Sequence, residues 1–353
     1  MDRPAILRTT AQELGLDALG ITSAASPCHA PHLTQWLHLS YHGEMNWMAK
    51  APEIRMDPQA YDPQARTILI AGLSSRQSAP TLPRGRIAAY AQGEDYHEIL
   101  RDLLEKLAQK TITPWGGKYR ITVDSSPLME KPLAAKAGLG WQGKNTLLIH
   151  QEHGPWLLLG CLLTDLEIPA DIPSSDHCGT CTRCLDACPT QAFPQPYVLD
   201  ARRCLAYLSI EHPGPIPEEF RRPMGDRIFG CDECLEVCPW NRHARQSREI
   251  RLQSIPRPDL REMLSWDDHQ FRKEFRGTPI FRLKHRRWLR NLCVVLGNIG
   301  TTEDLPDLQQ AAAREDSLIR EHAQWAIARI QERGNLPLAT DPNKTTAKSC
   351  SIF

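Results

Sequence analysis

The sequence contains 353 residues, which is enough for two or three domains, and 41% of them are hydrophobic, which suffices for buried cores. Its 42 Lys and Arg balance its 42 Asp and Glu, so general attraction to nucleic acid is excluded, and such a partner would need a local basic patch. The chain lacks both a secretion signal and an apolar run of the roughly eighteen residues that span a membrane. We therefore expect a cytoplasmic protein without membrane association, and nothing in the sequence demands more than a monomer.

The first 170 residues mix helical and strand patterns and predict one domain of the α/β or α+β type. Residues 1–20 alternate charged and apolar residues and predict an amphipathic helix. Residues 86–111 change from a strand pattern to leucines at helical spacing. The remaining predicted elements are strands at 66–74, 119–126 and 156–168 and a helix with a glycine stop at 127–140.

The glycines of G-L-G-W-Q-G, from Gly138 to Gly143, match the dinucleotide fingerprint G-x-G-x-x-G. That fingerprint follows a strand and opens a helix, whereas here a predicted helix comes first and a predicted strand, 144–150, follows. We therefore interpret these glycines as a helix end and a close approach to a flat cofactor, not as a site for NAD or FAD.

Seven cysteines are concentrated in two short runs, each closed by Cys-Pro. The first run has the spacing C-x2-C-x2-C-x3-C-P of bacterial ferredoxins and contains Cys178, Cys181, Cys184 and Cys188. The second is a shortened copy with Cys231, Cys234 and Cys238, and we assign its missing member to Cys204. Eight thiolates would then hold two 4Fe–4S clusters. In such pairs the fourth cysteine of a run serves the other cluster.

This crossing divides the cysteines into two sets of four ligands. We expect the first set to be Cys178, Cys181, Cys184 and Cys238, and the second to be Cys188, Cys204, Cys231 and Cys234. Zinc and disulfides are the alternatives, but zinc sites favour more widely separated C-x2-C pairs, and disulfides belong to secreted chains. Of the others, Cys161 and Cys293 lie in apolar runs and are expected in cores, and Cys350 only formally matches a prenylation motif.

A basic segment, defined as residues 271–290, follows the cysteine region. Its eight basic residues, opposed within the segment only by Glu274, are Arg272, Lys273, Arg276, Arg282, Lys284, Arg286, Arg287 and Arg290. In a neutral chain such density predicts an RNA-phosphate-binding face, although a solvated helix face is the alternative. The interleaved aromatic residues, Phe271, Phe275, Phe281 and Trp288, could anchor the segment in the core or stack on bases. Repeated helical patterns after residue 280 resemble HEAT hairpins.

Taken together, these motifs resemble the epoxyqueuosine reductase family of cobalamin-dependent iron–sulfur enzymes. The resemblance extends to about residue 335 and rests on D-S-x-P-x-x-E and G-L-G-W-x-G-K-N within 123–149, on both cysteine runs, and on the stretches 52–58, 88–100, 204–212 and 320–330. It implies an α+β protein with an N-terminal α/β cobalamin-binding domain at 1–170 and a two-cluster ferredoxin-like module at 171–245. A basic linker with HEAT-like, tRNA-binding helices at 246–335 and a disordered tail at 336–353 would follow.

The resemblance also implies a reaction and a site. Epoxyqueuosine at the wobble position of a tRNA anticodon would be reduced to queuosine, with electrons passing from a reducing donor through the clusters to base-off cobalamin. Asp124 would donate the proton. The residues implied to line the cobalamin are Arg55, Tyr96, His97, Asp124, Lys144, Asn145, Ser209 and Asp232.

Asp124 follows a predicted strand, where its side chain can face a pocket. Burial against a corrin would raise the pKa of this carboxyl and keep it protonated, as a general acid requires. The alternative is that Asp124 caps the next helix. We expect Glu130 to be a structural partner of an arginine or of Lys131.

Two other functions remain open from the sequence. One is a reductive dehalogenase-like enzyme that uses cobalamin and clusters on a small molecule, and the other is an electron carrier without a substrate. The basic segment and the absence of an export signal disfavour the first, and the large N-terminal domain disfavours the second.

Overall fold

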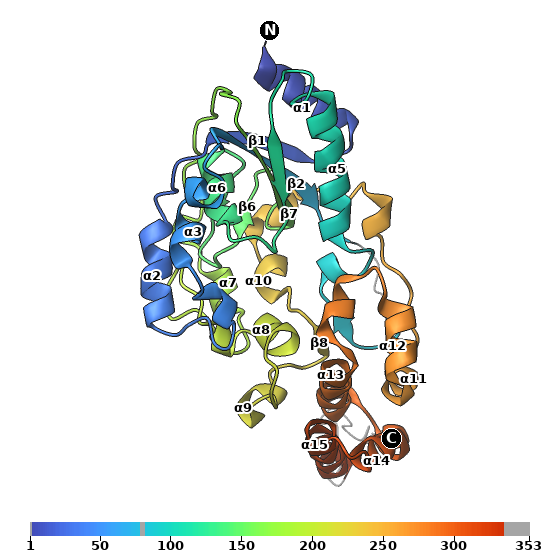
Figure 1. Ribbon diagram of the computed structural model, residues 1–353. Helices are drawn as coiled ribbons and strands as arrows, with labels where there is room; N and C mark the ends of the chain where they lie inside the picture. Colours follow the sequence, from blue (N-terminus) through green and yellow to red (C-terminus); the bar gives the residue numbers. More distant parts are fainter. Residues whose placement is uncertain (1, 78–81, 335–353) are drawn as a thin grey trace, which may run out of the picture.

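An antiparallel sheet organises the N-terminal half of the computed structural model, which describes residues 2–77 and 82–334 (Figure 1). The strand order is β1 (Ala18–Ser23), β2 (Thr67–Ser74), β7 (Leu157–Thr164) and β4 (Tyr119–Thr122), and every neighbouring pair is antiparallel. The strands predicted from apolar runs are therefore confirmed. The expected α/β character of this domain is corrected to α+β, because α/β domains are built on parallel strands.

Both faces of the sheet are covered, which explains why β2 reads as a continuous apolar run. Leu69 and Leu73 pack beneath α1 (Arg3–Glu13) and α5 (Tyr96–Lys110), whereas Ile68 and Ile70 pack on the opposite face with α6 (Glu130–Lys136). Successive side chains of a strand point to opposite faces, so a strand between two helical layers is apolar at every position.

Residues 1–20 hold a helix and the start of a strand, so the single helix predicted there is wrong. The helix α1 ends at Glu13, Gly15 adopts a φ of +91°, and β1 begins at Ala18. A left-handed glycine directly after a helix reverses the chain without the steric cost of a side chain, and it allows the strand to return onto the sheet.

Short elements connect the sheet to the cysteine region. They are α2 (Ala30–His38), η1 (Asn46–Met48), α3 (Pro52–Met56), α4 (Pro58–Tyr61), β3 (Arg86–Ile87), η2 (Ala89–Ala91), β5 (Trp141–Gln142), β6 (Leu148–Ile149), α7 (Arg183–Asp186), η3 (Ala201–Arg203), α8 (Leu205–Ile210), α9 (Glu218–Arg221), β8 (Arg227–Phe229), α10 (Glu233–Glu236), η4 (Pro239–Arg242) and η5 (Ile250–Leu252). Strand β3 pairs with β8 in parallel.

The glycine fingerprint lies between α6 and the β5–β6 hairpin, as the argument against a dinucleotide site requires. A Cβ atom on Gly140 would come within 2.1 Å of the Ile149 carbonyl oxygen. Gly140 is therefore needed because the chain passes very close to Ile149 at this point. This contact with the backbone replaces the expected contact of Gly140 with a flat cofactor.

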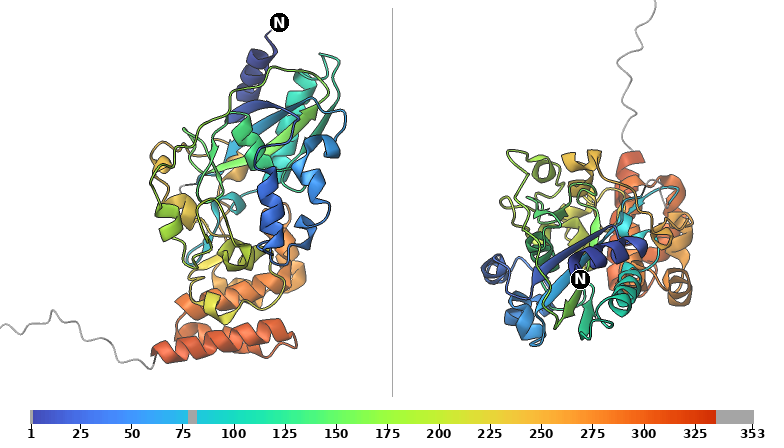
Figure 2. Two further views of the ribbon diagram at one scale, coloured as in Figure 1. Left: turned by 90° about the vertical axis from the view of Figure 1, so that its left-hand side faces the viewer. Right: turned by 90° about the horizontal axis from the view of Figure 1, so that it is seen from above.

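The C-terminal helices form the end of an elongated molecule opposite the N-terminus (Figure 2). They are α11 (Leu260–Ser265), α12 (Asp268–Phe275), η6 (Pro279–Leu283), α13 (His285–Ile299), η7 (Thr302–Asp304), α14 (Leu305–Ala312) and α15 (Ser317–Gly334). Their core also includes Leu208, Phe220 and Phe229 from the cysteine region, so these helices lean on the rest of the chain. The predicted tail, 336–353, lies outside the described residues, and across the described ranges no helix has the length and apolar character to cross a bilayer.

Arg290 is part of this shared core, so its predicted contact with tRNA is wrong. Its residue exposure is 0%. The guanidinium donates to the backbone carbonyls of Leu208, His212 and Gly214 at 2.7–2.9 Å and to Asn291 Oδ1 at 3.0 Å. A buried charge is tolerated here because its donors are satisfied by fixed carbonyl dipoles.

We expect Arg290→Met to lower the free energy of unfolding by about 3 kcal/mol, because it leaves buried carbonyl groups without donors. The Tm from thermal denaturation measures the loss. Arg320→Met, at an exposed position of α15, serves as the control and should leave the Tm unchanged. Equal Tm values for both variants would contradict the structural role of Arg290.

Candidate active site

The carboxylate of Asp124 lies on a tight turn after β4. Asp124 adopts a φ of +55°, and the Ser125 N–H donates to the Val123 carbonyl at 2.5 Å. A positive φ outside glycine is uncommon and concentrates at functional sites, with Asp and Asn the residues that tolerate it best. The side chain is 61% exposed, so the strained turn presents it to the solvent side of the sheet edge.

Two side chains from α5 bind this carboxylate. The Tyr96 hydroxyl donates to Asp124 Oδ2 at 2.8 Å, and His97 Nε2 lies 3.3 Å from the same oxygen. Helix α6 has Met129 at its N-cap position and no side-chain cap. The helix-cap alternative for Asp124 is therefore wrong, and its position against Tyr96 and His97 agrees with the expected grouping of these three residues.

Glu130 supports the turn in a way that the sequence did not indicate. Its Oε1 accepts a hydrogen bond from the Asp124 backbone N–H at 2.8 Å, so its direct partner is neither an arginine nor Lys131. Burial, together with the negative charge of Asp124, raises the pKa of Glu130 to about 8. Glu130 is thus protonated at neutral pH and fixes the backbone of Asp124 without adding a second negative charge.

His97 is held in a charged network that includes two residues the sequence did not assign to it. Asp95 Oδ1 lies 2.7 Å from His97 Nδ1, and Arg282 donates to Asp95 Oδ2 at 2.8 Å. Arg282 also lies 2.8 Å from the His97 ring. Arg282, which was predicted to bind tRNA, is therefore also part of the acid site. The D-Y-H order of residues 95–97 was the only local signal for Asp95.

Opposing effects set the protonation states of Asp124 and His97. Although the Asp124 side chain is 61% exposed, the surrounding protein displaces part of its water and so raises its pKa, but hydrogen bonds from His97 and Tyr96 outweigh this effect and hold the pKa below its usual value. Burial lowers the pKa of His97, but hydrogen bonds to Asp124 and Asp95 outweigh it and raise the pKa. The expected upward shift for Asp124 requires a corrin against it and stays a prediction, whereas without a corrin the two shifts favour a protonated His97 beside an ionised Asp124.

Lys144 and Asn145 contact the cysteine loops. The Lys144 ammonium donates to the carbonyls of Gly179 and Cys181 at 2.6 and 3.0 Å, and the Asn145 amide donates to the Cys234 carbonyl at 3.0 Å. Each residue therefore attaches the N-terminal domain to one cysteine run. These bonds give both residues a structural role, and their expected contact with the corrin stays a prediction.

Ser209 also has a structural role. It is 1% exposed, and its hydroxyl donates to the Leu205 carbonyl at 2.8 Å and accepts from the Gly230 N–H at 3.0 Å. The predicted contact of Ser209 with cobalamin is therefore wrong, since its hydroxyl is committed to the turn that precedes Cys231.

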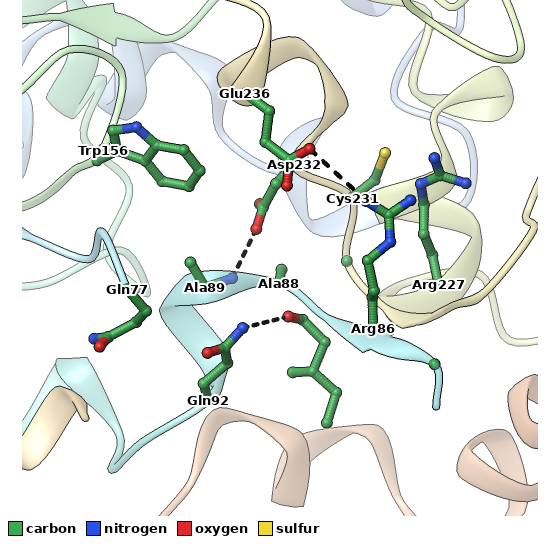
Figure 3. A pocket seen from close by; sticks show the side chains of 13 residues that line it. Gln77, Arg86, Ala88, Ala89, Gln92, Trp156, Arg227, Cys231, Asp232 and Glu236 are labelled. Atoms are coloured by element: carbon green, nitrogen blue, oxygen red, sulfur yellow. Dashed lines mark hydrogen bonds and ion pairs between the residues drawn. The ribbon is translucent and has the colours of Figure 1, made fainter. Parts of the chain in front are cut away.

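A cavity of 230 Å³ lies between the β3–η2 segment and the second cysteine run (Figure 3). Cys231, Asp232 and Trp156 are among the residues that line it. Asp232 accepts a hydrogen bond from the Ala89 N–H at 2.7 Å, and burial raises the pKa of its carboxyl to about 6. Asp232 therefore lies in the wall of this cavity, and its expected contact with cobalamin stays a prediction.

Arg55 lies on α3 beside an exposed tryptophan. Its guanidinium carbon lies 5.1 Å from the Trp47 ring centroid, and its Nε is buried without a hydrogen-bond acceptor among the described residues. An unsatisfied buried donor is unusual in a native structure. Helix α4 follows α3 directly, and its Tyr61 hydroxyl lies 3.5 Å from Ser126 Oγ in the Asp124 loop.

Cys204 and the seven cysteines of the two runs are free thiols. Burial and the neighbouring Cys178, Cys238 and Cys181 raise the pKa of Cys184 to about 11. Burial and the thiols of Cys204, Cys231, Cys184 and Cys188 raise the pKa of Cys234. The eight thiols therefore lie close together, and their division into two ligand sets stays a prediction.

Cys204, a member of the second predicted set, lies on the side of the acid, because Cys204 and Asp124 are both within electrostatic range of the Lys131 ammonium. Tyr90 lies between Asp124 and Asp232, both of which act on its hydroxyl, and its ring contacts those of Tyr96 and Phe229. An aromatic wall therefore connects the acid with the cavity beside Cys231.

The basic segment is only partly available to a ligand. Its buried aromatic residues, Phe271, Phe275 and Trp288, anchor it in the core, and Arg287 donates to the Ile210 carbonyl at 2.6 Å. Exposed Arg272 and Arg286 form ion pairs with Asp268 and Asp316 at 2.6 and 2.5 Å. In the part of the chain that the structure describes, the exposed residues of the segment without an acidic partner are Lys273, Arg276 and Lys284.

Comparison with known proteins yields consistent matches. The family model described as "4Fe-4S double cluster binding domain" matches residues 177–241, and that of "Epoxyqueuosine reductase QueG, DUF1730" matches residues 55–125. The epoxyqueuosine reductase of Xanthomonas campestris is 43% identical over 93% of this chain and 96% of its own length. That of Escherichia coli is 40% identical over 92% and 88%, respectively.

Solved structures of the same kind resemble the fold. A crystal structure of epoxyqueuosine reductase with an epoxyqueuosine-modified tRNA-Tyr stem loop is 29% identical and superposes with a TM-score of 0.86, covering 93% of this chain and 90% of that one. The Streptococcus thermophilus structure gives a TM-score of 0.87 at 28% identity, covering 94% and 91%. A Bacillus subtilis structure, with its catalytic loop swung out of the active site, gives 0.83 at 29% identity, covering 93% and 90%.

We expect Cys204→Ala to reduce the iron and sulfide content of anaerobically purified protein by about half, because it removes one ligand of the second set. Cys161→Ala, in β7, is the control and should retain full iron. Full iron in Cys204→Ala would remove Cys204 from the ligand set.

Proposed function

The chain belongs to the epoxyqueuosine reductase family, and we propose that Asp124 is the proton donor in its reduction of epoxyqueuosine to queuosine at the wobble position of tRNA. The observation that carries this proposal is the Asp124–His97–Tyr96 cluster, which lies next to one of the two cysteine sets. The reaction consumes two electrons and two protons, and it releases the epoxide oxygen as water while an alkene remains.

The residues of the site fit the cofactors of this family. The eight thiols match two 4Fe–4S clusters in number, grouping and spacing. For cobalamin, Tyr96, His97 and Asp232 provide the walls, and the unpartnered Nε of Arg55 suits an amide carbonyl of a corrin side chain. The cavity is smaller than the roughly 300–1,000 Å³ of small-molecule pockets, so a corrin would extend from it toward Tyr90 and Asp124. When bound, the clusters and cobalamin supply the electrons.

Asp124 and His97 form a proton-donating pair. An epoxide oxygen leaves poorly as an anion, so a proton delivered in the transition state contributes about 10²–10⁴ in rate. His97 Nε2 lies 3.3 Å from Asp124 Oδ2, and the raised pKa of His97 with the lowered pKa of Asp124 favours a proton on His97 and a negative charge on Asp124. Displacement of solvent by the substrate disfavours this charge separation and would move the proton onto Asp124. Tyr96 and Glu130 hold the carboxylate and its turn in position throughout.

The basic segment supports tRNA as the substrate. Arg282 belongs to this segment and also binds Asp95 and His97, so the surface that carries Lys273, Arg276 and Lys284 continues to the acid. Sequence-specific RNA recognition usually targets single-stranded loops whose bases are splayed out. A basic surface at the rim of the acid site suits such a loop and would be superfluous for a small organohalide or for a simple electron carrier.

Several finer expectations accompany this proposal. A tRNA substrate agrees with a cytoplasmic, monomeric enzyme that receives electrons from a separate donor. The division at residues 170 and 245 and the HEAT-like nature of α13–α15 also remain predictions, supported by the stacking of these helices in one core.

We expect Asp124→Asn to reduce turnover of epoxyqueuosine-containing tRNA by at least about 100-fold. Asparagine tolerates the positive φ, so iron content and cobalamin absorption should be retained. Ser125→Ala, in the same turn, is the control and should remain active. An active Asp124→Asn variant would exclude the proposed role.

The pH dependence provides a second test of the pair. Because the pKa of His97 is raised by its carboxylate neighbours, His97 stays protonated to a higher pH than an ordinary histidine. We therefore expect turnover to fall as the pH rises through the pKa of His97, and His97→Gln to abolish this limb of the profile. An unchanged alkaline limb in His97→Gln would show that another group supplies the proton.

We expect the triple variant Lys273→Ala, Arg276→Ala, Lys284→Ala to weaken tRNA binding. The slope of log K against log salt concentration should fall by roughly 2–3, because three phosphate contacts are lost. Equilibrium binding with a fluorescent anticodon stem loop measures both quantities. Lys110→Ala, Lys118→Ala, Arg320→Ala is the charge-matched control from exposed positions elsewhere. Equal effects of the two triple variants would contradict a specific surface.

A further inference from the structure

The two cysteine sets have different surroundings. The second set lies next to the acid and the cavity, as described above. Cysteine burial does not distinguish the sets, because every member is half-buried except Cys238 of the first set, which is buried. The difference lies in the neighbouring residues: Gly179 and Arg183, between the cysteines of the first set, are exposed. One set is thus oriented toward the substrate side, and the other is accessible from solvent.

An aromatic group connects the surface to the first set. Trp141 is 2% exposed and packs with Cys178 and Cys238 in one apolar cluster. Its ring lies 4.8 Å from that of half-buried Trp240 and 4.9 Å from that of exposed His177. These rings close the gap between solvent and the ligands of the first set without a charged or flexible group.

Positive charge surrounds the same loop. Arg183 precedes Cys184 directly, and Arg242 follows Cys238 by four residues. Both are exposed and form no ion pair with the described residues. Lys144 adds a third cation through its bonds to Gly179 and Cys181. The carboxylates of this loop, Asp176 and Asp186, accept hydrogen bonds from Cys178 N and Thr182 Oγ1, both at 2.7 Å. Three cations therefore oppose two carboxylates.

The electrons for the reaction have to arrive from outside the chain. The single glycine fingerprint is a helix-to-hairpin connection, so it provides no nicotinamide or flavin site at which a hydride could be divided into single electrons. An iron–sulfur cluster accepts one electron at a time. The matching donor is a protein with a one-electron centre, and its surface should be acidic to complement the three cations.

We propose that the face formed by residues 177–184 with Trp240 and Arg242 is the docking surface for a small acidic one-electron carrier protein. This proposal rests on the proposed function. Each encounter oxidises the reduced carrier by one electron and reduces the first cluster by one electron. Two encounters supply the two electrons that one epoxide consumes, and the two protons come from solvent through the acid site.

The test is stopped-flow reduction of the holoenzyme, without tRNA, by a reduced acidic two-iron ferredoxin. We expect Arg183→Glu, Arg242→Glu to lower the second-order rate of cluster bleaching at least tenfold at low salt, and rising salt to reduce the difference. The charge-matched control is Lys110→Glu, Arg320→Glu, at exposed positions of α5 and α15. Reduction by photoreduced deazaflavin, a small molecule that needs no docking surface, should be equal in all three proteins.

Each result of this experiment has a different interpretation. An unchanged rate in Arg183→Glu, Arg242→Glu, or an equal loss in the control pair, would overturn the docking surface. If the glutamate variant loses iron, Arg183→Gln, Arg242→Gln replaces it, with an expected loss of about half the logarithmic effect because only half the charge changes. If steering is observed but the wild-type protein does not convert epoxyqueuosine-containing tRNA, the proposed function fails while the docking surface stands.

Discussion

The hydrogen bonds of Lys144 and Asn145 to three backbone carbonyls are the constraint on which the arrangement of this protein depends. They fix the N-terminal sheet domain to both cysteine runs at once, one residue to each run. Neither run has a long helix or strand of its own: α7 and α10 contain four residues each. Without the contacts from the first domain, the ligands of the two sets would have no fixed relation to Asp124. Adjacent residues of one short turn therefore align the electron path with the proton source.

The proposed acid site would allow a carboxylate that is ionised at rest to serve as a proton donor. Its position on a strained turn is fixed by Glu130, which stays protonated and adds no repulsion. Its proton is stored on His97, whose own charge is stabilised by Asp95 on the other side of the ring. Asp124 has His97, a source of protons, within hydrogen-bond distance.

The parts of the site that were predicted from sequence are those defined by local spacing. The cysteine sets follow from the intervals between ligands, and Asp124, Tyr96 and His97 come from motifs a few residues long. The failures concern burial and partners that only the tertiary structure determines. Arg290 and exposed Arg286 look equivalent in the sequence, yet one is a core residue. Arg282 meets Asp95 across 187 residues, a pairing that no local pattern contains. The fold shows the same division, since the apolar strands were found but the strand after Gly15 was hidden in an apparently continuous helix.

The positions of the charged residues in the structure explain how a chain of zero net charge can bind charged partners. A strongly basic protein would attract tRNA and an acidic electron carrier to the same surfaces, and the two would compete. Here many arginines are neutralised by a carboxylate or by backbone carbonyls, and exposed cations without an ion pair among the described residues include those of the basic segment and those beside the first cysteine run. In the view of Figure 1, α12 with its exposed cations lies on the right, and α7 of the first cysteine run lies on the left. With the cysteine module between them, substrate and donor can be bound at the same time, so electrons can be supplied while the tRNA stays in place. Such an arrangement would allow the enzyme to receive further electrons without releasing a partly reduced substrate.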